Sequence, residues 1–320
     1  MANSFAVQPL PPEADRVLIL VNPKAGARSA RERVDRSVVL LRERGVSAEV
    51  FTDLAQVALE ADRQHQAGRL RALVGVGGDG TAAELVNRTR PGVPLTMLPA
   101  GNENLLARHL GLGNTPEALC RTIADGGLIR LDAGSAAGRI FLLMASCGFD
   151  AEVVRRLHAR RTGHVRSLTY VKPIWETIRS YQYPEIRVYW DGACGPRDGL
   201  VLPGEGGGQA PSAVLRWLFA FNLPCYGGGL RLAPQADAAD GRLDVCGFSR
   251  GSLWDGLRYA AAVYRGRHQA LPDCLTHRAS RLRITSDAEV PYQLDGDPGG
   301  VLPVDIEVLP GRLTLVAGRQ

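Results

Sequence analysis

The 320-residue chain has no apolar run near the roughly 18 residues that a membrane-spanning helix needs. Its first residues, from Met1 to Leu20, lack the basic start and the small-residue cleavage site of a secretory signal. Six cysteines are scattered through the sequence without a CxxC pair, which argues against a zinc ribbon or a redox motif. We therefore expect a cytoplasmic protein whose cysteines are reduced and partly buried.

Charged residues make up only 22% of the sequence and hydrophobic residues 45%, a balance that excludes wholesale disorder. The length is sufficient for two domains. The net charge of +5 favours an anionic partner. Charge alone does not choose between nucleic acid, an acidic membrane face and a nucleotide.

The first part of the chain alternates between strand-like and helix-like patterns. Residues 17–21 form a continuous apolar run, as expected for a parallel strand that is buried on both faces. Further strands are predicted at 48–52, 73–76 and 95–98. The alternation predicts a parallel α/β sheet, in which ligands bind beyond the carboxyl ends of the strands. Glycine- or asparagine-rich loops lie at three of these ends: 22–26, 77–81 and 99–104.

The loop at 77–81 reads Gly-Gly-Asp-Gly-Thr and indicates phosphate binding. Its glycines allow a sharp turn and let backbone N–H groups approach an anion closely. Thr81 and Glu84 have capping-box spacing, which predicts that a helix begins here with its positive end facing the loop. Asp79 would repel a bare phosphate, so we expect a phosphate accompanied by a divalent metal, or a hydroxyl that needs orienting. A glycine-rich turn without a ligand is the alternative.

From about residue 131 the sequence changes to short alternating segments separated by turn signals such as Asp191-Gly192 and Asp240-Gly241. This pattern predicts an antiparallel sheet or sandwich. Helical patterns interrupt it at about 167–181 and 252–265.

Together these motifs resemble those of the soluble lipid kinase superfamily, the bacterial diacylglycerol kinases and their sphingosine and ceramide kinase relatives. The resemblance covers nearly the whole chain, and six motifs fall in the family's order. In the first part they are Asn22-Pro23-Lys24-Ala25-Gly26, Gly77-Gly78-Asp79-Gly80-Thr81 with Glu84 and Asn87, and Pro99-Ala100-Gly101 followed by Asn104. In the second part they are Gly148-Phe149-Asp150-Ala151, Gly227-Gly228-Gly229 with Pro234 and Asp240-Gly241, and Gln293-Leu294-Asp295-Gly296-Asp297.

The resemblance implies a nucleotide-binding α/β domain at 1–130, a β-rich lipid-binding domain at 131–308, and an active site in the cleft between them. The last strand, within 309–320, is expected to return to the first domain. Thr52 and Thr81 match positions that contact the nucleotide in the family, although Thr52 alone also reads as an ordinary strand-end hydroxyl. The expected nucleotide-binding residues are Asn22, Thr52, Gly77, Gly78, Asp79, Gly80, Thr81 and Asn102.

Asp297 aligns with the family's proton acceptor, which is usually Glu and one methylene longer. If the local backbone is extended, Asp295 and Asp297 point to the same face, and two carboxylates held close raise one pKa, as suits a general base. We therefore expect Asp297 to take the proton of the acceptor alcohol, aided by Asp295 and Asp79. A plain Asp-Gly hairpin turn is the alternative for the first pair, and an Asx turn is the alternative for Asp79.

Asp240 resembles the family's structural magnesium position, where main-chain oxygens of Asp237 and Arg242 complete the set. An Asp-Gly turn without a metal is the alternative. Two departures from the family lie in the third loop, which usually has Thr where this chain has Asn102 and Asp where it has Leu105. Asn102 keeps a hydrogen-bond donor for phosphate. The missing acid at Leu105 suggests a subfamily with a rearranged acceptor side.

A basic segment follows the Gly148-Phe149-Asp150-Ala151 motif and has two interpretations. One is a solvated helix face, and the other is a lip that meets anionic lipid headgroups. Its residues are Arg155, Arg156, His158, Arg160, Arg161, His164 and Arg166.

The sequence thus predicts an ATP-dependent, Mg²⁺-assisted kinase that transfers the γ-phosphoryl group to a lipid alcohol, diacylglycerol-like or sphingoid. The expected partners are ATP, the lipid and the anionic inner face of the membrane, with no nucleic acid and with a homodimer left open. An NAD kinase is the second hypothesis, because NAD kinases share the Gly-Gly-Asp-Gly loop. The third is a non-catalytic lipid-binding protein that keeps the fold, motivated by Leu105 and Asp297.

Overall fold

The computed structural model describes residues 7–21, 27–159, 177, 180–190 and 210–318. The chain divides into two compact units. Unit 1 comprises Met1–Asp132 with Pro310–Gln320, and unit 2 comprises Ala133–Leu309. The strands β6 (Gly127–Ala136) and β17 (Val304–Ala317) pass from one unit into the other.

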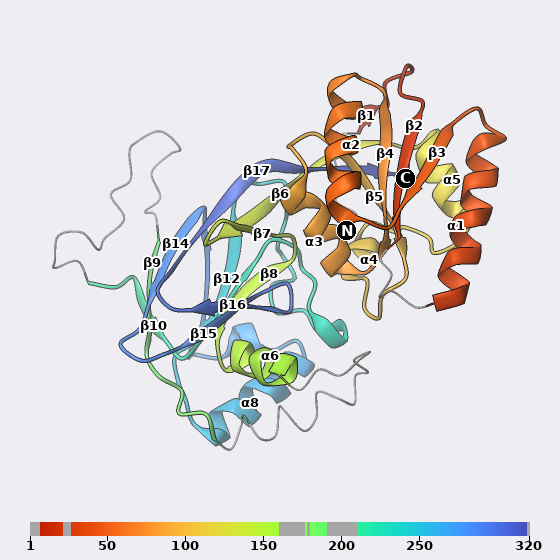
Figure 1. Ribbon diagram of the computed structural model, residues 1–320. Helices are drawn as coiled ribbons and strands as arrows, with labels where there is room; N and C mark the ends of the chain where they lie inside the picture. Colours follow the sequence, from red (N-terminus) through yellow and green to blue (C-terminus); the bar gives the residue numbers. More distant parts are fainter. Residues whose placement is uncertain (1–6, 22–26, 160–176, 178–179, 191–209, 319–320) are drawn as a thin grey trace. The chain divides into compact units, whose positions relative to one another are not determined.

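Unit 1 is a parallel sheet with helices on both faces, as the sequence predicted (Figure 1). Its elements are β1 (Gln8–Pro9), β2 (Arg16–Val21), α1 (Ala27–Arg42), β3 (Ser47–Phe51), α2 (Leu54–Gln66), β4 (Leu70–Gly77), α3 (Asp79–Arg88), β5 (Pro94–Pro99), α4 (Leu105–His109) and α5 (Pro116–Asp125). The strands lie in the order β17–β5–β4–β2–β3, and each neighbouring pair is parallel. Thr314 and Leu315 pair with Pro94 and Leu95, so the C-terminal half of β17 completes this sheet.

The alternation of side chains along β2 explains why the sheet is covered on both sides. Val17 and Ile19 pack with Val34 and Leu41 of α1 in one core, which α5 also enters. Leu18 points to the opposite face and is also fully buried. A strand with apolar side chains on both faces is stable only between two layers of helices.

Unit 2 contains two antiparallel sheets. Its elements are β7 (Arg139–Phe141), β8 (Met144–Gly148), α6 (Phe149–Ala159), β9 (Ile186–Trp190), β10 (Ala213–Leu215), β11 (Trp217–Phe221), the 3₁₀ turn η2 (Gly227–Gly229), β12 (Leu243–Phe248), α8 (Leu253–Tyr264), the 3₁₀ turn η3 (His268–Ala270), β13 (Cys274–Ala279), β14 (Arg281–Thr285), β15 (Pro291–Leu294) and β16 (Asp297–Val301). One sheet has the order β10–β9–β14–β17 and the other β13–β12–β11–β8–β15–β16. Leu218 and Leu294 of the second sheet share a buried core with Leu282 and Ile306 of the first. The predicted β-rich sandwich is therefore confirmed.

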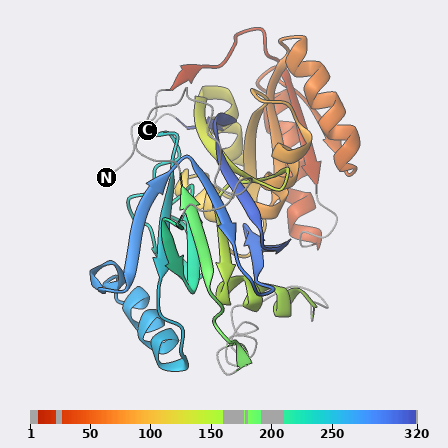
Figure 2. The same cartoon turned by 90° about the vertical axis from the view of Figure 1, so that its left-hand side faces the viewer.

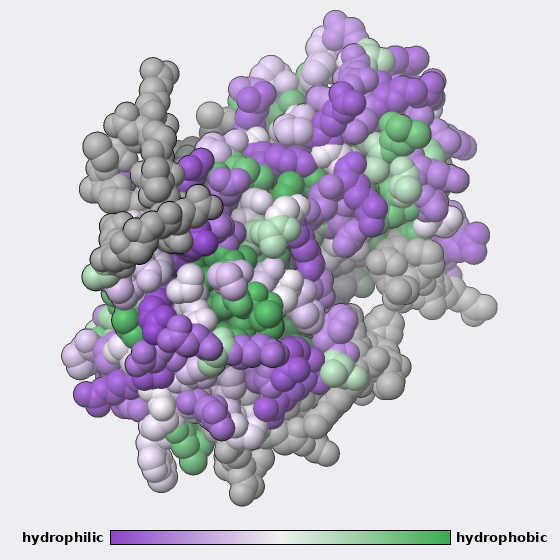
Figure 3. Space-filling view, turned by 60° about the vertical axis from the view of Figure 1, so that its left-hand side comes forward, coloured by the Kyte–Doolittle hydropathy of each residue, from purple (hydrophilic) through white to green (hydrophobic). Residues whose placement is uncertain are grey.

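The helix expected at 252–265 forms as α8, and Ser252 caps it by accepting a hydrogen bond from Asp255 N at 3.1 Å. The helix expected at 167–181 lies mostly outside the described residues. No helix within the described part of the chain is long and apolar enough to cross a membrane. Hydrophilic residues cover most of the face drawn in Figure 3, and apolar residues show through in patches.

Candidate active site

The loops that follow β4 and β5 lie against each other at the carboxyl edge of the unit 1 sheet. Ala100 N donates a hydrogen bond to Gly77 O at 3.0 Å. A Cβ atom on Gly101 would lie 2.7 Å from Gly78 Cα, and one on Gly77 would lie 2.2 Å from Thr81 Oγ1. Only glycine permits such close approaches, so the two loops together present bare backbone at the strand ends.

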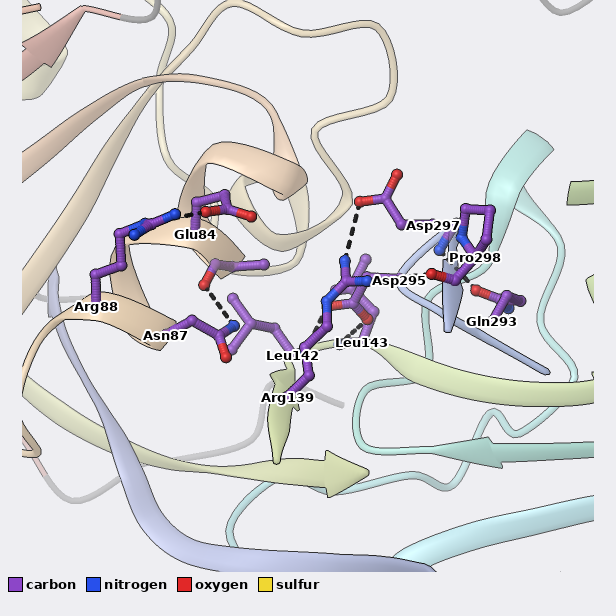
Figure 4. A network of polar contacts seen from close by, with 12 residues as sticks. Glu84, Asn87, Arg88, Arg139, Leu142, Leu143, Gln293, Asp295, Asp297 and Pro298 are labelled. Atoms are coloured by element: carbon purple, nitrogen blue, oxygen red, sulfur yellow. Dashed lines mark hydrogen bonds and ion pairs between the residues drawn. The ribbon is translucent and has the colours of Figure 1, made fainter. Parts of the chain in front are cut away.

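Helix α3 begins at Asp79, with Gly78 as its N-cap, and the predicted capping box of Thr81 and Glu84 is wrong. The Gly78 carbonyl accepts hydrogen bonds from the N–H groups of Thr81 and Ala82, at 3.0 and 3.3 Å, so Thr81 already lies inside the first turn. Glu84 instead forms an exposed ion pair with Arg88 at 3.3 Å (Figure 4). The helix still points its N-terminus at the loop, which favours an anion there.

Asp79 caps a helix other than its own. Its Oδ2 accepts a hydrogen bond from Leu105 N and its Oδ1 accepts one from Leu106 N, each at 2.9 Å. Asn104, the N-cap of α4, adopts a φ of 49° and instead exchanges hydrogen bonds with Gly101 at 3.0 and 2.8 Å. Asp79 therefore caps α4 from the first residue of α3, and each of its oxygens retains lone pairs for a further ligand.

Replacing Asp79 by Ala is expected to lower the free energy of unfolding by about 2 kcal/mol, because two backbone N–H groups lose a charged acceptor. Hydrogen exchange at the amides of Leu105 and Leu106 should accelerate in the same variant. Asp53→Ala is the matched control, since Asp53 caps its own helix through one hydrogen bond, to Gln56 N at 2.8 Å. Unchanged protection of the two leucine amides in Asp79→Ala would contradict this role.

The other predicted nucleotide-binding residues lie at the same edge of the sheet where they are described. Thr52 is exposed directly after Phe51, which ends β3 beside Leu20 of β2. Asn102 is exposed in the loop after β5. Asn22 and the rest of 22–26 lie outside the described residues.

Asp295 and Asp297 occupy the hairpin between β15 and β16 in unit 2. Asp295 has a φ of 51° and Gly296 a φ of 87°, so the backbone turns sharply here. The extended segment that would have placed both carboxylates on one face is therefore not formed. The Asp-Gly hairpin, which the sequence left as the alternative, is what the chain adopts.

The Asp295 carboxylate is bound by the backbone that leads into β8 (Figure 4). It accepts hydrogen bonds from Leu142 N at 2.6 Å, Leu143 N at 2.8 Å and Met144 N at 3.0 Å. Asp295 N in turn donates to Met144 O at 3.0 Å. These hydrogen bonds fix the hairpin to the start of β8.

The Asp297 carboxylate faces a different partner, the guanidinium of Arg139 (Figure 4). Arg139 Nη2 lies 3.2 Å from Asp297 Oδ2, and Arg139 Nη1 donates to Pro298 O at 3.3 Å. The side chains of Asp297 and Arg139 are 41% and 36% exposed, so a ligand can reach them. The sequence motifs give no indication of Arg139, which precedes the hairpin by more than a hundred residues.

A polar network, also without a role assigned from the sequence, links the hairpin to β8 and α6. Gln293 Oε1 accepts a hydrogen bond from Gly296 N at 2.7 Å, and Gln293 Nε2 donates to Ser146 Oγ at 2.8 Å and to Asp150 Oδ2 at 3.2 Å. Ser146 Oγ donates to Asp150 Oδ2 at 2.5 Å, and the Tyr226 hydroxyl donates to Asp150 Oδ1. Burial raises the pKa of Asp150, which these three donors lower only in part.

Asp150 should make the stability of the protein depend on pH. Because its pKa is higher in the folded state than in the unfolded state, its stabilising contribution is complete below the unfolded pKa. That contribution is lost as the pH rises through the folded pKa. Urea unfolding of the wild type and of Asp150→Asn between pH 3.5 and 7 tests this, since other titrating groups cancel in the difference. The wild type should lose stability relative to the variant as the pH rises, and a constant difference would contradict the assignment.

The predicted metal position lies in the turn before β12. Asp240 Oδ1 accepts a hydrogen bond from Arg242 N at 3.0 Å, and its Oδ2 contacts Arg278 Nη2. Asp237 Oδ1 accepts one from Ala239 N at 3.1 Å. Among the described residues, no group of three or more His, Cys, Asp or Glu side chains is arranged around a common metal position.

Asp244, the second residue of β12, provides an argument for a cation near this turn. Its side chain is 1% exposed, and neither carboxylate oxygen has a hydrogen-bond partner among the described residues. Arg278 Nε lies 3.6 Å away, and burial raises the pKa of Asp244 to about 6. A carboxylate that is buried with only this long ion pair to Arg278 is costly, and a bound hard cation would stabilise it. The carboxylate oxygens of Asp240 and Asp244 are donors of the kind that magnesium prefers.

Known proteins resemble both halves of the chain. Residues 16–136 match the diacylglycerol kinase catalytic domain, and residues 144–317 match the YegS C-terminal NAD kinase beta sandwich-like domain. The chain is 28% identical to a diacylglycerol kinase of Mycobacterium tuberculosis over 316 residues, covering 96% of this chain and 97% of that protein. It is 24% identical to a diacylglycerol kinase of Bacillus subtilis over 294 residues, covering 90% and 91%.

Two solved structures share the fold. A diacylglycerol kinase from Bacillus anthracis superimposes with a TM-score of 0.68 at 21% identity, covering 95% of this chain and 97% of that one. An NAD kinase from Archaeoglobus fulgidus in complex with ATP gives a TM-score of 0.51 at 12% identity, covering 95% and 94%. With matches to both domains in order along its length, the chain belongs to the diacylglycerol kinase family.

Proposed function

We propose that this protein is an ATP-dependent lipid kinase that transfers the γ-phosphoryl group to the hydroxyl of a lipid alcohol such as diacylglycerol. The observation that carries the proposal is the half-exposed Asp297 carboxylate, held by Arg139 on a hairpin that Asp295 fixes to the backbone. A carboxylate that is reachable and also held in position suits a general base. The named relatives support the same reaction class.

Unit 1 is proposed to hold the nucleotide. The backbone of 77–81 and the N-terminus of α3 supply N–H groups and a positive dipole end for its phosphates. Thr52 and Asn102 supply side-chain hydrogen bonds from the neighbouring loops, together with Asn22. Magnesium bound with ATP would offset the charge that develops on the transferred group.

The acceptor chemistry is proposed for unit 2. Asp297 takes the hydroxyl proton as the lipid oxygen forms its bond to the γ-phosphorus, while the bond between that phosphorus and the β,γ-bridging oxygen breaks and ADP leaves. The proton remains on the Asp297 carboxyl group until solvent accepts it. Arg139 orients the carboxylate, and Asp295 positions the hairpin without touching the reacting atoms.

A second magnesium ion is proposed as a structural group of unit 2. Asp240 would bind it, with main-chain oxygens of Asp237 and Arg242, and the buried Asp244 carboxylate would lie close by. Such an ion would neutralise acidic groups in this turn and would take no part in the transfer.

Phosphorylation assays test the proposal directly. The purified protein is incubated with labelled ATP and Mg²⁺ and offered diacylglycerol, sphingosine or ceramide in mixed micelles, and NAD in a separate reaction. Label in a lipid, lost when EDTA removes the metal, is the expected result. Label in NAD alone would replace the proposal by an NAD kinase activity. Calorimetry that finds lipid binding without Mg²⁺-dependent ATP binding would instead indicate a non-catalytic lipid-binding protein.

A further inference from the structure

Helix α8 exposes a stripe of apolar side chains on one side. Trp254 is 77% exposed, Tyr264 82%, and Leu253 and Leu257 are 38% each. At roughly 100° per residue, these four positions fall within an arc of roughly 100° around the helix. We call this set the α8 stripe.

The opposite side of α8 anchors the helix without help from the stripe. Tyr259 is 1% exposed, stacks on Phe248 with ring centroids 4.2 Å apart, and donates its hydroxyl to Asp273 Oδ2 at 2.5 Å. Gly256 lies close to the Trp217 ring, and a Cβ there would be 3.4 Å from Trp217 Cζ2. A helix packed on one side usually presents polar residues to water on the other. Because α8 is apolar on both sides, we expect the α8 stripe to be covered by a second apolar environment.

The accessible charge around the stripe is positive. Arg265 and Arg267 are exposed just after the helix, and Arg250 lies just before it with its side chain 69% exposed and 3.8 Å from the buried Asp273 carboxylate. The nearby acids are withdrawn from the surface, because the side chains of Asp255 and Asp273 are only 19% and 8% exposed. An apolar stripe flanked at both ends by arginines is complementary to an anionic lipid surface.

We propose that the α8 stripe docks unit 2 on an anionic lipid bilayer, with α8 lying in the plane of the interface. Trp254 and Tyr264 carry amphipathic rings that favour the headgroup level, and the two leucines enter the acyl region. A helix of 12 residues is about 18 Å long, which suits an interfacial position. The inference rests on the proposed function for its biological purpose, since a lipid kinase must reach an acceptor that lies in a membrane.

This assignment moves the membrane contact from the segment that the sequence indicated. In α6, Arg155 and Arg156 both form ion pairs with the single carboxylate of Glu152 at 2.6 Å, which offsets one of their two positive charges. The rest of the basic segment, from Arg160 onward, lies outside the described residues. Figures 1 and 2 both place α6 and α8 at the same end of unit 2.

Vesicle binding without any nucleotide tests the proposal. The full-length protein should sediment with phosphatidylglycerol-containing vesicles much more than with pure phosphatidylcholine vesicles. The double variant Trp254→Ser/Leu257→Ser should bind the anionic vesicles at least about tenfold more weakly, because two interfacial side chains are lost. Leu59→Ser is the matched control, since Leu59 is 75% exposed on α2 in unit 1 and should not affect binding.

Two further measurements probe the orientation and the charge. Tryptophan fluorescence should shift to the blue when anionic vesicles are added, and Trp254→Phe should lose most of this shift while it still binds the vesicles. Arg265→Glu/Arg267→Glu should weaken binding to anionic vesicles and remove most of its salt dependence. Circular dichroism of each variant shows whether the fold is retained.

Three outcomes would overturn the docking proposal: vesicle binding by the double variant equal to that of the wild type, no binding by the wild type, or a wild-type dimer that the double variant converts to monomer. The last would identify a second copy of the chain as the occupant of the stripe. Failure of the proposed function can be distinguished from failure of the docking proposal, because a short-chain diacylglycerol in detergent measures phosphoryl transfer without a bilayer. The double variant should phosphorylate that substrate at the wild-type rate and long-chain diacylglycerol in vesicles much more slowly.

Discussion

Asp297→Asn is expected to slow lipid phosphorylation by about 10²- to 10⁴-fold, the range that a general base contributes. Asparagine keeps the size of the side chain and an oxygen for Arg139, but it cannot accept the hydroxyl proton. The free energy of unfolding should change little. The substitution removes only one ion pair, between Asp297 Oδ2 and Arg139 Nη2 at 3.2 Å, and both side chains are partly exposed. Initial rates at saturating ATP, together with urea unfolding of the same preparation, give both numbers.

Two further variants show whether the loss belongs to the base itself. Asp287→Asn removes the charge from another exposed ion pair, to Arg187 at 2.8 Å, and should leave the rate unchanged. Asp297→Glu restores the residue that is usual in the family and should retain measurable transfer. If Asp297→Asn keeps the wild-type rate, another group accepts the proton and the mechanism proposed for unit 2 is wrong.

Asp295→Ala should have the largest effect on stability, a loss of about 3 kcal/mol or more in the free energy of unfolding. The truncation leaves the N–H groups of Leu142, Leu143 and Met144 without their shared acceptor, in a part-buried position. The rate of transfer should also fall, because the hairpin that carries Asp297 loses its attachment to the start of β8. Urea unfolding and the same initial-rate assay measure the two effects.

Asp295→Asn separates the two effects, since it keeps one acceptor oxygen and the local shape. It should lose roughly half as much stability as the alanine variant and remain folded for kinetic work. Asp305→Ala, at a side chain 56% exposed and 3.8 Å from Arg283, is the matched control and should change stability by less than about 1 kcal/mol. Equal stability of Asp295→Ala and the wild type would contradict the anchoring role.

The sequence predicted the elements whose signal is periodic. The apolar run that begins at Val17 predicted β2 correctly, because a strand buried on both faces is apolar at consecutive positions. The pattern that begins at Ser252 predicted the start of α8 correctly, because the cap and the helix are adjacent in the sequence. The prediction that Thr81 caps α3 was wrong because it used local sequence alone. The spacing of Thr81 to Glu84 satisfied a local rule, but Gly78 was free to provide the N-cap one turn earlier.

The candidate site was predicted only where its signal is local. The glycines of 77–81 identify a close backbone approach without further information. The partners of the acidic residues could not be predicted, because Arg139 reaches Asp297 across 158 positions and Leu105 reaches Asp79 across 26. The left-handed φ of Asp295 is also stabilised by such distant contacts, so the extended backbone assumed from the sequence was the wrong conformation.

The bond between Asp79 and α4 has a consequence for how this loop can change in evolution. The donors at Leu105 and Leu106 are main-chain N–H groups, so the link between the two loops does not depend on which side chain position 105 carries. The acidic residue that is usual in the family at that position can be exchanged for leucine while the geometry of the glycine-rich loop is kept. Proline alone, which has no N–H group, is excluded there. The side chain at position 105 can thus change while the backbone of the glycine-rich loop keeps its geometry.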